Sequence, residues 1–346
     1  MQNTSVFMHN VLVTGGAGFI GHHLVKGLSS IDCKITIVDN LSNANKNFLL
    51  SVRNTSLSSN INPMHVTLYD NDVSLYKEDI RNKEAIIDIC KREDIDTCVH
   101  LAAKISVSDS VINSENTIDV NVRGTLNVLE ARSKMDVRKF VFASSSAVYG
   151  EPKLLPISEE QQLDPLSPYG ASKIAGEALV SSFRNTRKIQ NAVSLRIFNV
   201  FGEGQSSEYA GVITKFAERL SASLPPLIYG DGNQTRDFIS VDDVVSAIVL
   251  LLASDAGKDE EKSFPYSSSP RGHVFNVGTG KATKIKDLAH MMIKIFDLDL
   301  EPLYSEPRRG DIVNSFADIG RLKTGLRFVP SNEIDVSLKK MFMHAC

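Results

Sequence analysis

The chain of 346 residues contains no tryptophan and only four cysteines. No two cysteines form a Cys-x-x-Cys pair, which argues against a zinc ribbon and against a disulfide framework. We therefore expect reduced thiols in a cytoplasmic protein. The eight histidines are scattered through the sequence, so no metal site is expected.

Long hydrophobic runs and an excess of one charge are also missing. The longest aliphatic run is residues 247–253, whereas a membrane helix needs about 20 residues. The first ten residues hold no lysine or arginine, and no signal-peptide pattern follows them. The 38 basic and 41 acidic residues give a net charge of −3, which argues against a protein that coats nucleic acid. We expect neither a membrane nor a nucleic-acid partner.

Short β-branched runs alternate with helical patterns in the first 200 residues, which is typical of a doubly wound α/β fold with a parallel sheet. The polar stretch 42–72 predicts only a short helix within a loop. Expected strands are Val11–Thr14, Ile35–Val38, Thr97–Leu101, Lys139–Ser144 and Ala192–Phe198. Expected helices are Ile20–Leu28, Ile86–Lys91, Ile118–Ala131, Ser172–Phe183, Gly211–Leu220, Val241–Ala253 and Ile285–Phe296.

Three glycines in frame follow the first expected strand and open the first expected helix. Gly15, Gly18 and Gly21 permit a tight turn and a close approach of backbone to a pyrophosphate at a helix N-terminus. Asp39 ends the second strand, where a carboxylate can bind ribose hydroxyls and would repel a 2′-phosphate. The pattern predicts an NAD site, and the alternative is a plain turn with a capping aspartate.

Tyr169 and Lys173 are four residues apart and therefore share one face of a helix. The lysine charge is expected to favour phenolate and to lower the pKa of Tyr169, which suits general acid–base chemistry. A serine run, residues 144–146, ends an expected strand at the edge where α/β proteins bind ligands. Spacing alone leaves an exposed helix pair as the alternative.

A series of motifs makes the chain resemble the extended short-chain dehydrogenase/reductases, and among them the NAD-dependent sugar-nucleotide epimerases. The motifs run in family order over nearly the whole chain. They are GGAGFIG (15–21), VDNLSN (38–43), DI (79–80), HLAA (100–103), NVRGTLNVLEA (121–131), SSSAVYG (144–150), SPYGASK (167–173), RIFNVFG (196–202), GDGNQTRDFISVDD (230–243), FNVGTG (275–280) and RRGD (308–311).

The resemblance, together with the change of rhythm near residue 199, implies two parts. Residues 1–199 are expected to form a Rossmann-type NAD-binding domain, with a strand and a helix contributed from about residues 234–255. Residues 200–346 are expected to form most of a smaller α/β lobe that binds substrate. Family members commonly dimerise through two helices, so a homodimer through the Ile118–Ala131 and Ser172–Phe183 segments is also implied.

The resemblance assigns roles to individual residues. Ser145, Tyr169 and Lys173 are implied as the catalytic set. The residues expected to bind NAD are Gly15, Gly18, Phe19, Ile20, Gly21, Asp39, Asn40, Asp79, Ile80, Leu101, Ala102, Ala103 and Lys173. The residues expected at the substrate are Ser106, Ser145, Tyr169, Asn199, Arg236, Arg308, Asp311 and Ser315. The two arginines are expected to grip a diphosphate, and the alternative for each is a surface salt bridge.

The implied reaction is 4-epimerisation of a UDP-hexose. Ser146 and Ala147 follow Ser145, whereas the 4,6-dehydratases of the family carry acids there to remove water. Ser315 stands where epimerases specific for plain hexoses carry a bulky tyrosine, so UDP-GlcNAc and UDP-GalNAc are expected substrates, alone or beside UDP-glucose and UDP-galactose; otherwise Ser315 is an ordinary strand residue. A UDP-glucuronate 4-epimerase, another sugar-nucleotide oxidoreductase of the family and a catalytically silent NAD-binding protein remain as alternatives.

Overall fold

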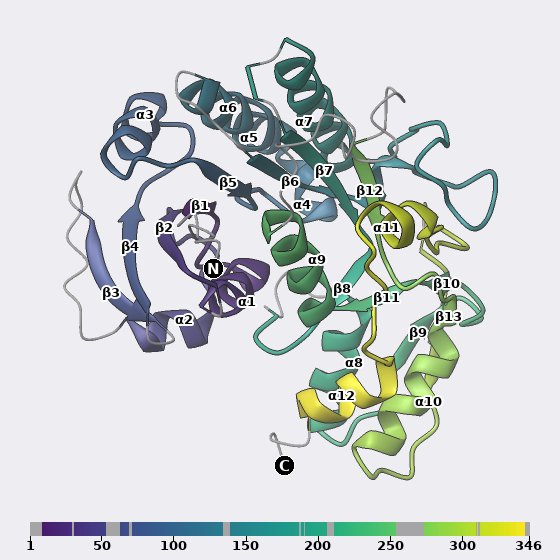
Figure 1. Ribbon diagram of the computed structural model, residues 1–346. Coiled ribbons are helices and arrows are strands. Elements are labelled where there is room, and N and C mark those ends of the chain that lie inside the picture. The colour runs from purple at the N-terminus through teal and green to yellow at the C-terminus, as the bar shows by residue number, and fades with distance from the viewer. Residues whose placement is uncertain are drawn as a thin grey trace, which may run out of the picture.

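An eight-stranded sheet in the order β12-β7-β6-β5-β1-β2-β4-β3 forms the centre of the fold (Figure 1). The computed structural model describes residues 9–29, 31–52, 63–68, 71–133, 139–186, 188–189, 191–205, 211–253, 273–308, 310 and 312–342. In sheet order the strands span Val274–Val277, Asn191–Ile197, Lys139–Ser145, Thr97–His100, His9–Thr14, Cys33–Asp39, Asn71–Lys77 and Met64–Leu68. All neighbours are parallel except β3 and β4. The expected doubly wound α/β fold is confirmed.

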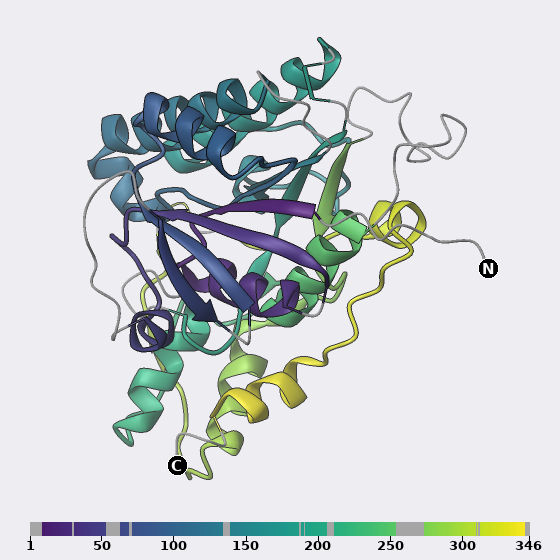
Figure 2. The same ribbon diagram turned by 60° about the vertical axis from the view of Figure 1, so that its left-hand side comes forward.

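The central strands are buried on both faces, as expected for a parallel sheet between two layers of helices. All four residues of β5 are buried, and so are six of the seven in β6 and in β7. One face is covered by α3 (Lys83–Arg92), α6 (Thr125–Ser133) and α7 (Pro168–Asn185), and the other by α1 (Phe19–Leu28) and α9 (Val241–Ala253). Figure 2 shows the sheet between these two layers.

The expected helix at Ile118–Ala131 is present but interrupted. It consists of α5 (Ser114–Ile118), a π-helical turn η1 (Asp119–Gly124) and α6. Such turns are frequent at functional sites. In the polar stretch 42–72, the expected short helix is α2 (Lys46–Ser51), but β3 and the start of β4 also lie there and were not predicted. These two strands form an antiparallel pair at the sheet edge.

A second group of elements lies beyond the sheet, at the lower right of Figure 1. It has its own core, which includes Phe216, Ile228, Leu288, Met292 and Leu338. Its helices are α8 (Val212–Ser221), α10 (Ile285–Ile295) and α12 (Ile334–Phe342), and its short strands pair β9 (Leu227–Tyr229) with β14 (Leu303–Ser305) and β10 (Thr235–Arg236) with β13 (Thr283–Lys284). Helices α8 and α10 were predicted within one residue at each end, whereas α12 and these strands were not predicted.

The chain returns from this group to the sheet more than once. Helix α9 packs beside α1, β12 forms the sheet edge beside β7, and α11 (Gly320–Gly325) packs in the same core. The short parallel pair β8 (Asn199–Phe201) and β11 (Phe238–Ser240) joins the two parts. Among the described residues, no helix is long and apolar enough to cross a membrane.

Candidate active site

A cavity of about 1410 Å³ lies at the carboxyl ends of β1, β2, β5 and β6, with residues of α8 and β9 on its lining. Nineteen of the residues singled out from the sequence line this one cavity. They are Gly15, Gly18, Phe19, Ile20, Gly21, Asp39, Asn40, Asp79, Ile80, Leu101, Ala102, Ala103, Ser145, Tyr169, Lys173, Asn199, Arg236, Arg308 and Ser315. The structure therefore brings together residues that are up to 300 positions apart in the sequence.

Two expected residues are not placed on this lining. Ser106 lies between Ile105 and Val107, which do line the cavity, but its hydroxyl accepts a hydrogen bond from the Asp109 backbone N–H at 3.0 Å. That contact makes Ser106 the N-cap of α4 (Val107–Ile112), so its side chain stabilises the start of this helix. Asp311 lies outside the described residues.

The glycine loop has the geometry that a phosphate cradle requires. Gly15 has φ +72°, and a Cβ there would stand 2.7 Å from the Ala102 backbone nitrogen. A Cβ on Gly21 would stand 2.2 Å from the Gly15 carbonyl oxygen, so only glycine lets α1 begin this close to the turn. At Gly18 the nearest atom would be 3.3 Å away. The N-terminus of α1 thus faces the cavity with its backbone close to any bound group, a cradle that fits a pyrophosphate.

Carboxylates gather where the ribose end of a dinucleotide is expected. Asp39 accepts hydrogen bonds from the backbone N–H groups of Ala17 and Leu41 at 3.0 and 2.8 Å, while burial raises its pKa. Asp79 accepts from Asn40 Nδ2 and Arg81 Nε, both at 2.9 Å. Burial alone would raise the pKa of Asp79, but these hydrogen bonds outweigh it and lower the pKa to about 2. Each oxygen of Asp39 accepts only one of these hydrogen bonds and can accept another from a hydroxyl, whereas Arg81 and Asn40 together already donate two hydrogen bonds to each oxygen of Asp79.

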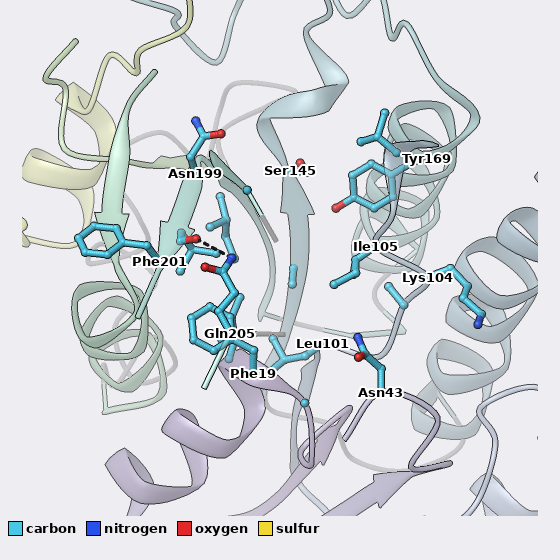
Figure 3. Close-up of a pocket in the computed structure, with 18 of the residues that line it drawn as sticks. Phe19, Asn43, Leu101, Lys104, Ile105, Ser145, Tyr169, Asn199, Phe201 and Gln205 are labelled. Carbon is cyan, nitrogen blue, oxygen red and sulfur yellow. Dashed lines mark hydrogen bonds between the residues drawn. The ribbon is translucent and has the colours of Figure 1, made fainter. Parts of the chain in front are cut away.

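Ser145, Tyr169 and Lys173 come together from two neighbouring elements. Ser145 ends β6, and Tyr169 and Lys173 lie in the first half of α7, which starts where the Ser167 hydroxyl accepts from the Gly170 N–H. Gly176 lets α7 lie close to β6, because a Cβ there would be 2.4 Å from the Phe142 ring. In Figure 3 the Tyr169 hydroxyl points into the cavity toward the strand that carries Ser145.

Burial dominates the electrostatics of this trio. Lys173 is buried, and its ammonium donates to the Ala143 carbonyl at 2.8 Å. Burial lowers the pKa of Lys173 to about 8, and the nearby Glu177 carboxylate opposes that fall. Burial raises the pKa of Tyr169, opposed by a hydrogen bond with Ser145. The expected lowering of the Tyr169 pKa is therefore wrong for this structure, in which loss of water around the phenol outweighs the hydrogen bond with Ser145.

A buried polar network behind the trio was not predicted. Arg196 donates to both carboxylate oxygens of Glu177, at 2.9 and 2.7 Å, and to the Tyr149 hydroxyl at 3.0 Å. The Ser144 hydroxyl donates to Glu177 at 2.5 Å, and the Tyr149 hydroxyl donates to Asn276 at 2.6 Å. A charged residue inside an expected apolar strand, as at Arg196, was the one sequence signal that could have indicated it.

Asn121, on the π-helical turn, was likewise missed as an individual residue. Its amide donates to the Lys104 carbonyl and to the Ser172 hydroxyl, both at 2.9 Å, and its carbonyl oxygen accepts from the Lys104 N–H. Asn121 therefore links the segment after β5, which lines the cavity, to α7 between Tyr169 and Lys173. A polar residue on the buried face of an expected helix was the available signal.

The far end of the cavity carries the expected substrate residues. The Arg308 guanidinium stacks on the Tyr229 ring, 3.8 Å from its centroid, and Arg236 donates to the Thr235 carbonyl. The Asn199 amide donates to the Asp237 carbonyl at 3.2 Å. Ser315 is 7% exposed and lines the cavity together with Asn199. Two cations and two small polar side chains thus face one end of a cavity whose other end is the glycine loop.

Comparison with known proteins agrees with this geometry. The model of the NAD dependent epimerase/dehydratase family matches residues 11–278. The chain belongs to this family. NAD is its cofactor, and the glycine cradle and the strand-end carboxylate described above fit it. All three residues of the expected catalytic trio lie within the matched range.

Relatives within this family cover nearly the whole chain. A protein of Methanocaldococcus jannaschii, named provisionally as a UDP-glucose 4-epimerase, is 36% identical over 96% of both chains. The solved UDP-N-acetylglucosamine 4-epimerase of Methanobrevibacter ruminantium in complex with UDP-N-acetylmuramic acid has a TM-score of 0.82 at 33% identity, covering 98% of this chain and 99% of its own. The UDP-glucose 4-epimerase of Thermotoga maritima with UDP-glucose has a TM-score of 0.82 at 32% identity, covering 97% and 99%.

Replacing Lys173 by methionine should stabilise the NAD-free protein at pH 7. A pKa of about 8 in place of 10.5 corresponds to a cost of about 3 kcal/mol for the buried ammonium, and the lost hydrogen bond to Ala143 offsets about 1 kcal/mol of the gain. We expect the free energy of unfolding to rise by about 2 kcal/mol, measured by urea denaturation.

The gain should depend on pH in a defined direction. The cost of the charged lysine is fully present below pH 8 and fades toward pH 10.5, because in that range only the unfolded chain holds the proton. The difference between variant and parent should therefore be smaller at pH 9.5 than at pH 7. Lys91→Met, at an exposed position of α3, is the control and should change stability little. A Lys173→Met protein that is less stable than its parent at both pH values would contradict the argument.

Proposed function

We propose that this chain catalyses the reversible 4-epimerisation of a UDP-hexose with bound NAD. The observation that carries the proposal is the meeting of Ser145, Tyr169 and Lys173 between a glycine cradle and a cationic end of the same cavity. Relatives that carry the name of UDP-sugar 4-epimerase and match over nearly the full length of the chain support it. The cavity volume of about 1410 Å³ exceeds the roughly 300–1,000 Å³ of an ordinary ligand pocket, which leaves space for a nucleotide sugar beside the cofactor.

In this proposal Tyr169 takes the proton from the sugar 4′-hydroxyl, and Ser145 holds the same oxygen by a hydrogen bond. Lys173, protonated at neutral pH with its pKa near 8, favours the phenolate form of Tyr169 when the proton moves. NAD supplies the acceptor for the hydride of C4′. The 4-keto sugar then turns about its diphosphate linkage, which Arg236 and Arg308 hold. The hydride returns to the opposite face of C4′, and Tyr169 gives the proton back to the 4′ oxygen.

The two residues after Ser145 favour epimerisation over elimination. Ser146 and Ala147 form the short 3₁₀ turn η2 (Ser146–Val148) on the cavity wall, and neither can act as an acid. A UDP-glucuronate epimerase would need an added hydroxyl or basic group to bind the sugar carboxylate. Lys104 also lines the cavity, but in Figure 3 its ammonium points away from Ser145 and Tyr169. The intact trio argues against a silent NAD-binding protein.

Incubation with each UDP-sugar pair, followed by chromatography of the products, tests the proposal. The protein should convert one epimer into the other without net formation of NADH. Tyr169→Phe should lower the rate by about 10²- to 10⁴-fold, the contribution of a general acid–base group, while NAD remains bound. Products lighter by water or carbon dioxide would contradict epimerisation, and no turnover of any nucleotide sugar would favour the NAD-binding alternative.

We further propose that N-acetylated UDP-hexoses are substrates. Ser315 is a small residue on the cavity lining, which leaves room for a substituent on the sugar. Its backbone N–H donates to the Thr235 carbonyl at 3.1 Å, so the position of its side chain is fixed by the pairing of the two segments. A larger side chain at this position would therefore project into the space that the substituent needs.

Ser315→Tyr should selectively reduce activity on the UDP-GlcNAc/UDP-GalNAc pair. A tyrosine would fill the space beside C2′ and clash with an N-acetyl group but not with a hydroxyl. We expect kcat/KM to fall at least about tenfold on the N-acetylated pair and much less on UDP-glucose/UDP-galactose. Ser221→Tyr, at an exposed position at the end of α8, is the matched control. Equal losses on both pairs would remove the argument from Ser315.

We propose a homodimer, with residues 1–199 and about 234–255 as the NAD-binding part and most of 200–346 as the substrate-binding part. Apolar side chains on the helices next to α7 support the dimer: Val111, Ile112 and Ile118 are 64%, 81% and 42% exposed. Light scattering should give twice the mass of one chain, and Ile112→Asp should shift the protein toward monomer. A monomeric parent protein would contradict the proposal.

A cytoplasmic location, expected from the cysteine pattern, stays a prediction.

A further inference from the structure

Two segments far apart in the sequence meet beside the glycine loop. Residues 42–46 follow β2, residues 203–205 follow β8, and both segments line the cavity at the end where Gly15, Gly18 and Asp39 lie. Asn45 connects them, because its Nδ2 donates to the Gly204 carbonyl at 2.8 Å. The contact spans 159 positions of sequence and closes the space between the two segments.

Asn45 is bound on three sides and is 5% exposed. Its backbone N–H donates to the Ala17 carbonyl of the glycine loop at 2.7 Å. Its side-chain oxygen accepts from the Phe48 N–H at 3.4 Å, at the start of α2. One residue therefore holds together the glycine loop, the helix after β2 and the segment after β8.

The opposite side of the contact is shaped to receive this amide. Gly204 has φ +77°, and a Cβ there would stand 2.3 Å from Asn45 Nδ2, so a larger residue would push the two segments apart. The neighbouring Glu203 carbonyl accepts a hydrogen bond from His23 Nε2 of α1 at 2.9 Å. Since α1 begins at the glycine loop, the 203–205 segment is fixed to the same turn from two directions.

We propose that Asn45 is a cofactor-retention residue, whose hydrogen bond to Gly204 keeps the cavity closed over the NAD-binding end. Both joined segments line the cavity beside the glycine loop that would hold NAD, so the intact bond would narrow the path by which the cofactor leaves. The inference rests on the proposed function, because a 4-epimerase returns its hydride in every turnover and works without releasing NAD. Asn45 then acts on the rate of cofactor release and not on the chemical step.

The test measures cofactor release directly, without sugar. The protein is loaded with NADH, excess NAD is added, and the loss of NADH fluorescence gives the rate of release. Asn45→Asp keeps the acceptor that caps α2 but removes the donor to Gly204. We expect release to become about five- to tenfold faster, the factor expected for one buried hydrogen bond.

Asn82→Asp is the matched control. Asn82 caps α3 through its side-chain oxygen, bonded to the Ala85 N–H, and is exposed and absent from the cavity lining. It should release NADH at the parent rate. Asn45→Ser, which keeps a capping oxygen but is too short to reach Gly204, is measured beside Asn45→Asp, and the circular dichroism of each shows that it is folded.

Faster release from both folded Asn45 variants and not from Asn82→Asp supports the proposal. Parent-like release from either Asn45 variant, or an equal acceleration in Asn82→Asp, overturns it. A parent protein that retains NADH but epimerises no UDP-sugar would instead contradict the proposed function, so the two failures are distinguishable.

Discussion

The ion pair between Glu177 and Arg196 is the contact on which the active site depends. Both side chains are buried, at 8% and 1% exposure, and they join α7 to β7 behind the cavity. Removing one partner would leave an uncompensated buried charge, which typically costs about 3–5 kcal/mol. Glu177 lies one helical turn after Lys173 and accepts from Ser144, the neighbour of Ser145. One pair therefore fixes the strand end and the helix that carry the reacting groups.

The same network explains why Lys173 can remain charged in a dry site. Glu177 is satisfied by Arg196 and Ser144, so it reaches Lys173 only as a distant charge that opposes the fall of its pKa. The ammonium itself is held by a carbonyl and lies over the Phe142 ring, 5.0 Å from its centroid. A carboxylate in direct contact would have raised the pKa of Lys173 and neutralised its charge locally. Burial without such a partner leaves a cation whose pKa is close to working pH and whose field is available to Tyr169.

Local patterns carried most of what could be predicted from the sequence. The glycine loop, the central strands, α9 and the Tyr169–Lys173 spacing each depend on neighbouring residues, and the structure places them as expected. The antiparallel pair β3–β4 was missed because its buried apolar residues, such as Val66 and Val73, alternate with polar ones after a long Ser- and Asn-rich stretch, so that the strand pattern is weak. Arg196 with Glu177, and Asn45 with Gly204, were missed because their partners are set by tertiary packing. The predicted direction of the Tyr169 pKa shift was wrong for a related reason. The sequence spacing places Lys173 beside Tyr169, but it does not show how deeply the phenol is buried.

The substrate end is positioned by a residue that does not line the cavity. Asp237, fully buried, accepts hydrogen bonds from the N–H groups of Thr279, Gly280 and Ala317. It thereby fixes the turn after β12 and the segment that follows Ser315 against β10 and β11. Arg236, which is proposed to bind the diphosphate, is its direct neighbour in sequence. Asp237 therefore fixes the backbone beside Arg236 and also beside Ser315, the residue proposed to admit the N-acetyl group. With the backbone held in this way, side-chain size at position 315 can change the shape of the sugar pocket without moving the groups that bind the diphosphate.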